Sequence, residues 1–179
     1  MKVSKVIFTS ISVLVLLVAG IVFFVSIPWT TLFAGIILSP APPKPEVTYA
    51  EFPFEIVYEI DGETFTVNDV YICEFGGIGA NEGQGKYRQW NGYVKKTREE
   101  GLFLTKIDGR KIYCSVGSPE YYMSDPDYTG YPSHEPHLYD VSDNDKFDFS
   151  LEAFENILQE HNINIISYKL SEPIENEYK

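Results

Sequence analysis

The stretch of sequence that decides the fold reads Phe54-Glu-Ile-Val-Tyr-Glu-Ile60, Asp61-Gly62, Glu63-Thr-Phe-Thr-Val67. Apolar and polar residues alternate before the Asp-Gly pair, which places the apolar side chains on one face of a strand. Glycine tolerates the positive φ angle of a type I′ turn, so Asp-Gly between two such segments is typical of a β-hairpin. The sequence therefore predicts two antiparallel strands joined at Asp61-Gly62.

A second segment repeats this pattern with the order Leu102-Phe-Leu-Thr-Lys-Ile107, Asp108-Gly109, Arg110-Lys-Ile-Tyr-Cys-Ser-Val116. Further β-prone runs lie at residues 70–75 and 163–170, and Ser150 can cap an amphipathic helix that ends near Glu160. We therefore expect an α+β fold in which an antiparallel sheet carries one C-terminal helix.

The chain between these elements is harder to assign. Residues 86–96 fit one strand, a small hairpin that turns at Asn91-Gly92, or a helical turn. Ser118 and Pro119 are typical of a helix start. Residues 124–145 show little periodicity.

An uncharged apolar segment of 22 residues, from Val6 to Ile27, precedes the strand-rich region. As a helix that rises about 1.5 Å per residue, it extends roughly 33 Å, enough to cross a hydrocarbon core of about 30 Å. Lys2 and Lys5 precede this segment and only Lys44 follows it closely, so the positive-inside rule predicts a cytoplasmic N-terminus at the cell membrane.

Four regions are therefore expected. They are cytoplasmic residues 1–5, a transmembrane helix over 6–27 in contact with lipid, an interfacial segment and Pro-rich spacer over 28–45, and an extracytoplasmic domain over 46–179. Pro28 can end or kink the helix, while residues 29–39 can continue it or lie along the interface. The alternative is a cleaved signal peptide, but its apolar core usually has about 7–15 residues and a small-residue cleavage site soon after it.

Charge excludes one class of partner. The formal net charge is −12, and all 26 acidic residues follow Pro45 with 11 basic ones, so that part of the chain carries −15. Nucleic acid needs cations matched to its phosphates, so we expect no nucleic-acid partner. A local basic stretch within residues 95–111 either offsets the acidic regions or contacts an anionic envelope polymer.

Cys73 and Cys114 both fall in expected strands. They either form a disulfide, which an oxidising compartment permits, or lie in the core as two small apolar thiols.

No motif for a cofactor, a metal or a catalytic residue is found. The Gly-rich segment 76–86 lacks the spacing of a Walker loop and of a dinucleotide fingerprint. His134-Glu135-Pro136-His137 and the acidic residues 143–148 lack the order of zinc and calcium sites. A solvated acidic loop is the simpler interpretation of both.

Aromatic residues provide the candidate ligand-binding surface. Tyrosine and tryptophan combine flat contact area with a polar group, so their clusters recur at binding surfaces and can stack on a sugar or a peptide. The alternative is that they pack an irregular segment onto the sheet. The candidate residues are Trp90, Tyr121, Tyr122, Tyr128 and Tyr131.

The layout of apolar helix, Pro-rich spacer and compact domain, with the segments 71–77 (Tyr-Ile-Cys-Glu-Phe-Gly-Gly) and 117–125, resembles the small uncharacterised envelope proteins of Gram-positive bacteria. This resemblance implies an envelope location. Three hypotheses for function follow: a binding module outside the membrane, a hydrolase or transferase that acts on envelope material through acidic residues, and an accessory subunit of a membrane protein.

Overall fold

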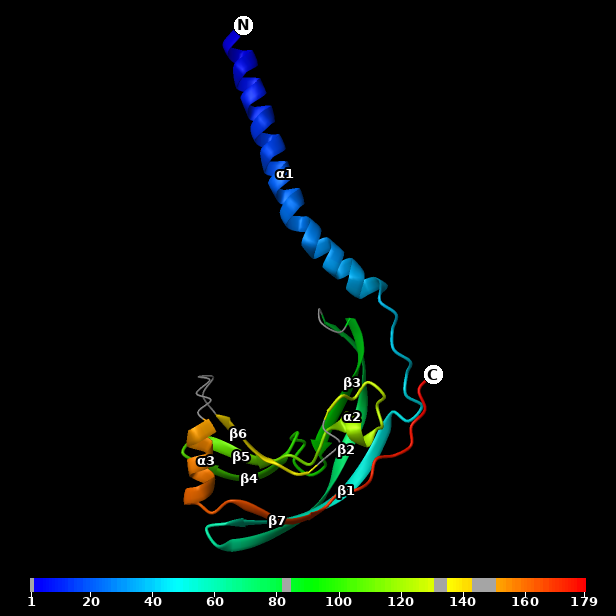
Figure 1. The fold of residues 1–179 in the computed structure, drawn as a ribbon, viewed down its shortest axis with the longest axis vertical. Coiled ribbons are helices and arrows are strands. Elements are labelled where there is room, and N and C mark those ends of the chain that lie inside the picture. Colours follow the sequence, from blue (N-terminus) through cyan, green and yellow to red (C-terminus); the bar gives the residue numbers. More distant parts are fainter. Residues whose placement is uncertain (1, 82–84, 131–134, 143–150) are drawn as a thin grey trace. The chain divides into compact units, whose positions relative to one another are not determined.

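The computed structural model describes residues 2–81, 85–130, 135–142 and 151–179 (Figure 1). They form two compact units. The first comprises Met1–Pro42 with Ile78–Tyr87, and the second comprises Pro43–Gly77 with Arg88–Lys179.

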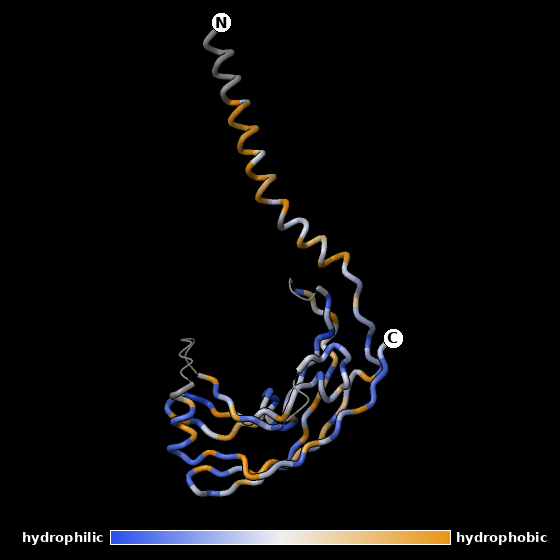
Figure 2. The backbone as a smooth tube through the Cα atoms, in the orientation of Figure 1, coloured by the Kyte–Doolittle hydropathy of each residue, from blue (hydrophilic) through white to orange (hydrophobic). Residues whose placement is uncertain are grey.

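Helix α1 (Lys2–Leu38) is the main element of the first unit. Its stretch Ile11–Leu38 is long and apolar enough to cross a membrane (Figure 2). The helix continues past Pro28, so residues 29–38 extend it, which is one of the two alternatives for them. Its ribbon bends on the way (Figure 1), as expected where a proline removes one N–H donor.

The end of α1 lies against the Gly-rich segment. The Lys86 ammonium donates to the carbonyls of Ile37 and Ser39, at 2.9 Å each. The last carbonyls of a helix lack partners and carry partial negative charge, so a cation there is favourable. The described parts of the Gly-rich segment 76–86 belong to the end of strand β2 (Glu63–Asn81) and the start of strand β3 (Gly85–Val94).

The second unit contains a four-stranded sheet with the order β3-β2-β1-β7. Its strands are β1 (Tyr49–Ile60), β2 (Glu63–Asn81), β3 (Gly85–Val94) and β7 (Asn164–Lys169), and the ends of β2 and β3 belong to the first unit. The hairpin predicted at Asp61-Gly62 is confirmed, because both residues have positive φ angles, 51° and 83°, and Ile60 pairs with Glu63. The expected strand over 70–75 is part of the long strand β2.

A second, three-stranded sheet has the order β4-β5-β6. The hairpin predicted at Asp108-Gly109 is also confirmed: it joins β4 (Leu102–Ile107) to β5 (Arg110–Cys114). Strand β6 (Leu138–Ser142) pairs with β5 and comes from the region without periodicity. The structure is α+β with antiparallel pairing as expected, but it has two sheets where one was expected.

Two helices complete the second unit. The short α2 (Pro119–Tyr122) begins as the sequence predicts, because the Ser118 hydroxyl accepts from the Tyr121 N–H at 3.2 Å. Helix α3 (Leu151–Glu160) matches the expected C-terminal helix, while its expected cap Ser150 lies outside the described residues.

Both sheets contribute to one hydrophobic core. Phe54 and Ile56 of β1 lie in the same buried cluster as Leu102 of β4 and Ile112 of β5. The alternation that predicts the first hairpin is confirmed, since Phe52, Phe54, Ile56 and Tyr58 are buried and their neighbours in β1 are not. Side chains at every second residue of a strand point to the same face, which is the face that meets the other sheet.

Cys73 and Cys114 lie in this core as free thiols, and a disulfide between them stays a prediction. Burial raises the pKa of the Cys73 thiol, and nearby Glu120 adds to this effect. Burial also raises the pKa of the Cys114 thiol, to about 12. Thiols react as thiolates, so both groups are inert in the folded protein.

We predict that a thiol reagent labels the native protein more than about 100-fold more slowly than free cysteine, because buried thiols of high pKa supply almost no thiolate. In denaturant without reductant, mass spectrometry should find two labels per chain. An unfolded chain that takes up no label would instead indicate a disulfide between Cys73 and Cys114.

Candidate functional site

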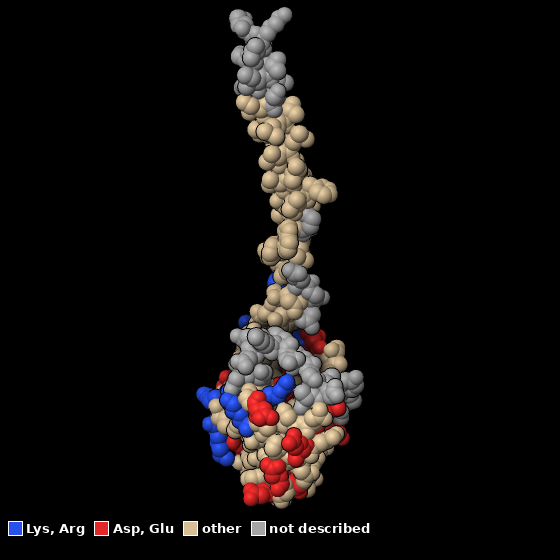
Figure 3. Space-filling model, turned by 90° about the vertical axis from the view of Figure 1, so that its left-hand side faces the viewer, with Lys and Arg blue, Asp and Glu red and all other residues tan. Residues whose placement is uncertain are grey.

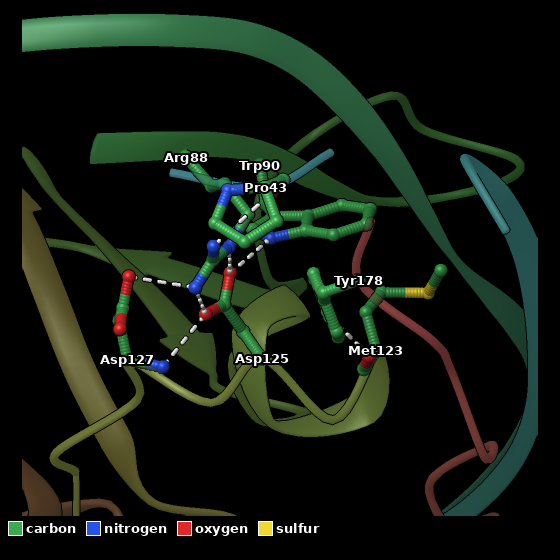
Figure 4. Close-up of polar contacts among 7 residues, drawn as sticks. All are labelled: Pro43, Arg88, Trp90, Met123, Asp125, Asp127 and Tyr178. Carbon is green, nitrogen blue, oxygen red and sulfur yellow. Dashed lines mark hydrogen bonds and ion pairs between the residues drawn. The ribbon is translucent and has the colours of Figure 1, made fainter. Parts of the chain in front are cut away.

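A buried ion pair joins strand β3 to the segment that follows α2 (Figure 4). The Arg88 guanidinium donates to both carboxylate oxygens of Asp125, at 2.8 Å from Nε and 2.6 Å from Nη2. The two side chains are 2% and 3% exposed. Trp90, two residues along β3, donates its indole N–H to the same carboxylate at 2.8 Å. Such bidentate, charge-assisted pairing is the strong form of this interaction.

Arg88 also contacts residues near both ends of the second unit. Its Nη1 donates to the carbonyl of Pro43 at 3.2 Å, and its guanidinium lies 4.7 Å from the ring centre of Tyr178. The Tyr178 hydroxyl donates to the carbonyl of Met123 at 2.7 Å. Residues 44–46 pair with residues 177–179 through backbone hydrogen bonds. The last residues of the expected spacer and the polar C-terminal tail are therefore part of the folded unit.

The pair also shifts the pKa of each partner. Burial alone raises the pKa of the Asp125 carboxyl, but hydrogen bonds from Arg88 and Trp90 outweigh it and keep this pKa below its ordinary value. The hydrogen bond to Asp125 likewise raises the pKa of Arg88. Both groups are therefore charged, and the segment 118–127 is fixed against β3.

This fixed segment forms one wall of a groove, which we call the Tyr71 groove, with a volume of about 640 Å³. Ligand pockets in proteins usually have about 300–1,000 Å³. The start of α2 and strands β2 and β3 contribute lining residues, as do the segment after β3 and strand β6. Four aromatic side chains line it: Tyr71, Trp90, Tyr93 and Tyr139.

Tyr71 is 3% exposed, and its hydroxyl lies against Gly92, which also lines the groove. A Cβ atom at Gly92 would be 2.1 Å from this hydroxyl, so only glycine leaves room for it. Within the described part of the chain, no group forms a hydrogen bond with the Tyr71 hydroxyl. A buried hydroxyl without a partner costs free energy, which a ligand in the groove can recover.

Charged groups surround the Tyr71 hydroxyl. Burial raises its pKa well above the ordinary value, with smaller contributions from Cys73 and from the carboxylates of Glu120 and Glu100. Both glutamates line the groove, as does Arg98. Arg98 lies 4.5 Å from the ring centre of Tyr93 and has a positive φ angle of 63°. Non-glycine residues in this conformation are uncommon and cluster at functional sites.

Of the four predicted ligand-binding residues that the structure describes, Trp90 lines the groove. Tyr122 is 1% exposed and packs against Phe52 in the core. This is the position expected if the aromatic residues pack the segment onto the sheet. Tyr121 and Tyr128 are half-buried and contact each other edge to face, and Tyr131 lies outside the described residues. A role in binding stays a prediction for these tyrosines.

Tyr71, Glu100 and Glu120 were not predicted as site residues, because each one is unremarkable in its own strand or turn. Tyr71 looks like one of several core residues of β2, and Glu100 and Glu120 are two of 26 acidic residues. One sequence pattern could have indicated the groove, namely Arg88, Trp90, Gly92 and Val94 at every second position. These residues share one face of β3, and a charged residue and a glycine among buried neighbours indicate a special site.

A second hollow of about 630 Å³ lies between α3, β7 and the start of β6. Its lining includes Leu138, Leu158 and Ile163, and it has no buried polar group comparable to Tyr71 among the residues described. No group of three or more potential metal ligands occurs in the described ranges. His134 and residues 143–148 lie outside them, and His137 lines the Tyr71 groove.

We predict that Asp125→Asn destabilises the second unit by about 3–5 kcal/mol, because it leaves the Arg88 charge buried without its partner. Asp127→Asn is the matched control. Asp127 also contacts Arg88 at 2.6 Å, but its side chain is 69% exposed, and exposed pairs contribute about 0.2–1 kcal/mol. Denaturant unfolding followed by Trp fluorescence measures both. Equal losses from the two variants would contradict the central role of the buried pair.

Comparison with family models, with curated proteins and with solved structures finds no match for this chain. Its function is therefore inferred from the residues of the Tyr71 groove and from helix α1.

Proposed function

We propose that this protein is a single-pass membrane protein whose domain outside the membrane binds a glycan of the cell envelope in the Tyr71 groove. The helix α1 supports the membrane location, because Ile11–Leu38 is long and apolar enough to span a bilayer. Lys2 and Lys5 precede the apolar stretch of this helix and favour an N-terminus in the cytoplasm. Residues 46–179 then lie outside, where glycans are the abundant polymers.

One observation carries the glycan proposal: a buried tyrosine hydroxyl without a described partner faces a groove with aromatic walls. A phenol can donate one hydrogen bond and accept others, which suits a sugar hydroxyl or amide. Sugars also present flat C–H faces, and aromatic rings supply flat contact area for them at low entropic cost.

The polar lining supports the same ligand class. Asn91, Ser115 and Ser118 lie in the groove beside the two glutamates. Few convergent polar groups among aromatic side chains are typical of sites that orient a small polar ligand. A purely apolar ligand would displace water from the Asn91 amide and from the two glutamates without replacing its hydrogen bonds, at a cost in free energy for each group.

The orientation is tested with single cysteines and a membrane-impermeant maleimide. In intact cells we expect Thr66→Cys, at an exposed position of β2, to be labelled, and Ser4→Cys to be labelled only after permeabilisation. The native cysteines are buried and give a low background. The opposite pattern would reverse the orientation, and a mature chain without residue 4 would show cleavage.

The groove is tested by calorimetric titration of the full chain in detergent micelles with an N-acetylglucosamine tetramer. We expect Tyr71→Phe to weaken binding about 5–10-fold, the effect of one lost hydrogen bond. Its stability should stay the same or rise, because the hydroxyl has no partner in the free protein.

Tyr122→Phe is the matched control. The Tyr122 hydroxyl is buried like that of Tyr71, but it donates to the carbonyl of Val116 at 2.7 Å and does not line the groove. This variant should lose about 1 kcal/mol of stability and keep its affinity. Wild-type protein that gives no binding heat with this tetramer or with a glucosamine tetramer would overturn the glycan proposal.

A hydrolase is the second candidate, because Glu100 and Glu120 line the same groove and both act on the pKa of Tyr71. Glycosidases commonly use two carboxylates on either side of the bond they cleave. Incubation of the same tetramer with the protein distinguishes the two functions. New reducing ends that disappear in Glu120→Gln would identify a hydrolase, whereas an intact tetramer after prolonged incubation supports binding alone.

A further inference from the structure

The charges of the Tyr71 groove are not balanced. Its lining holds the carboxylates of Glu100 and Glu120 and one cation, Arg98, so it carries a formal charge of −1 with His137 counted as neutral. Among the described residues, neither glutamate forms an ion pair or a side-chain hydrogen bond. Other acidic side chains in the same unit do have partners, such as Asp140 with Arg110 at 2.6 Å and Glu51 with Lys95 at 2.8 Å.

Arg98 does not neutralise these two carboxylates. Its guanidinium lies on the ring of Tyr93, and the hydroxyl of that tyrosine donates to Glu74 at 2.7 Å. This contact shows that one aromatic wall of the groove already accepts a cation. Electron-rich ring faces attract ammonium and guanidinium groups, most strongly where water is excluded.

The Tyr71 hydroxyl makes the site more than a cluster of acidic residues. It is buried, it has no described partner, and it lies beside Gly92 in the lining of the groove. A protonated amine has three N–H donors and no acceptor. Two carboxylates and a phenol oxygen offer the acceptors that such a group needs, while a neutral N-acetyl group has one donor and no charge for the carboxylates.

From this arrangement we infer that the ligand carries a free, protonated primary amine, as a de-N-acetylated amino sugar does, and that Glu100, Glu120 and Tyr71 bind this amine. The aromatic walls hold the sugar rings. This inference rests on the proposed glycan-binding function and names the chemical group that the groove selects.

The test compares two tetramers that differ only at their nitrogens, a glucosamine tetramer and an N-acetylglucosamine tetramer, titrated into the full chain in detergent micelles. We expect the free-amine tetramer to bind at least about tenfold more tightly, since hydrogen bonds between charged groups are roughly twice as strong as neutral ones. Glu100→Gln and Glu120→Gln should each reduce this preference several-fold. Added salt should reduce it as well.

Glu63→Gln is the control, because it changes the net charge of the chain equally but lies at the exposed start of β2 and does not line the groove. It should leave the preference unchanged. Equal affinity for the two tetramers would overturn the amine inference and leave glycan binding intact. A preference that survives in both glutamate variants would also overturn it.

Tetralysine distinguishes the source of the amine, because it carries the same kind of cation without a sugar ring. Weaker binding of tetralysine than of the glucosamine tetramer supports the amino sugar. Equal or tighter binding would retain amine recognition but assign it to a peptide and so overturn the glycan proposal. If no probe binds, both the inference and the proposed function are wrong.

Discussion

The buried pair between Arg88 and Asp125 is the interaction on which the second unit depends. A charge in the protein interior is costly unless it is paired and hydrogen-bonded. Arg88 meets this condition with Asp125, Asp127, the Pro43 carbonyl and the Tyr178 ring, while Trp90 completes the partners of Asp125. One guanidinium thereby connects β3, the segment after α2 and both ends of the unit.

The same pair gives the Tyr71 groove its shape. Asp125 lies three residues after α2, so fixing it against β3 also places Pro119 beside Gly92, with Ser118 and Glu120 in the same groove lining. The groove is thus a consequence of packing around a charge, and its open side retains carboxylates that this packing does not use. Arg88 of the buried pair lies on the same strand, β3, as Trp90 and Gly92, which line the groove.

The two units differ in how many charged residues they carry (Figure 3). Between Lys5 and Lys44 the chain has no charged residue, whereas every acidic residue follows Pro45. Lys86 is an exception in the first unit, and it is used at the end of α1, where helix carbonyls attract a cation. An apolar helix joined to a strongly charged domain is consistent with a protein that works at a membrane surface.

The sequence by itself determined the elements that depend only on residues close together in the chain. Period-two alternation with Asp-Gly turns predicted both hairpins, Ser118-Pro119 predicted the start of α2, and uninterrupted apolar residues predicted α1. Tertiary structure decided what depends on distant partners: that β6 pairs with β5, that the C-terminal tail pairs with residues 44–46, and that Cys73 and Cys114 lie in one core. It also decided the candidate site, because Tyr71, Gly92 and Glu120 come from separate elements. The burial of the Tyr71 hydroxyl and the missing Cβ beside it exist only once those elements are packed.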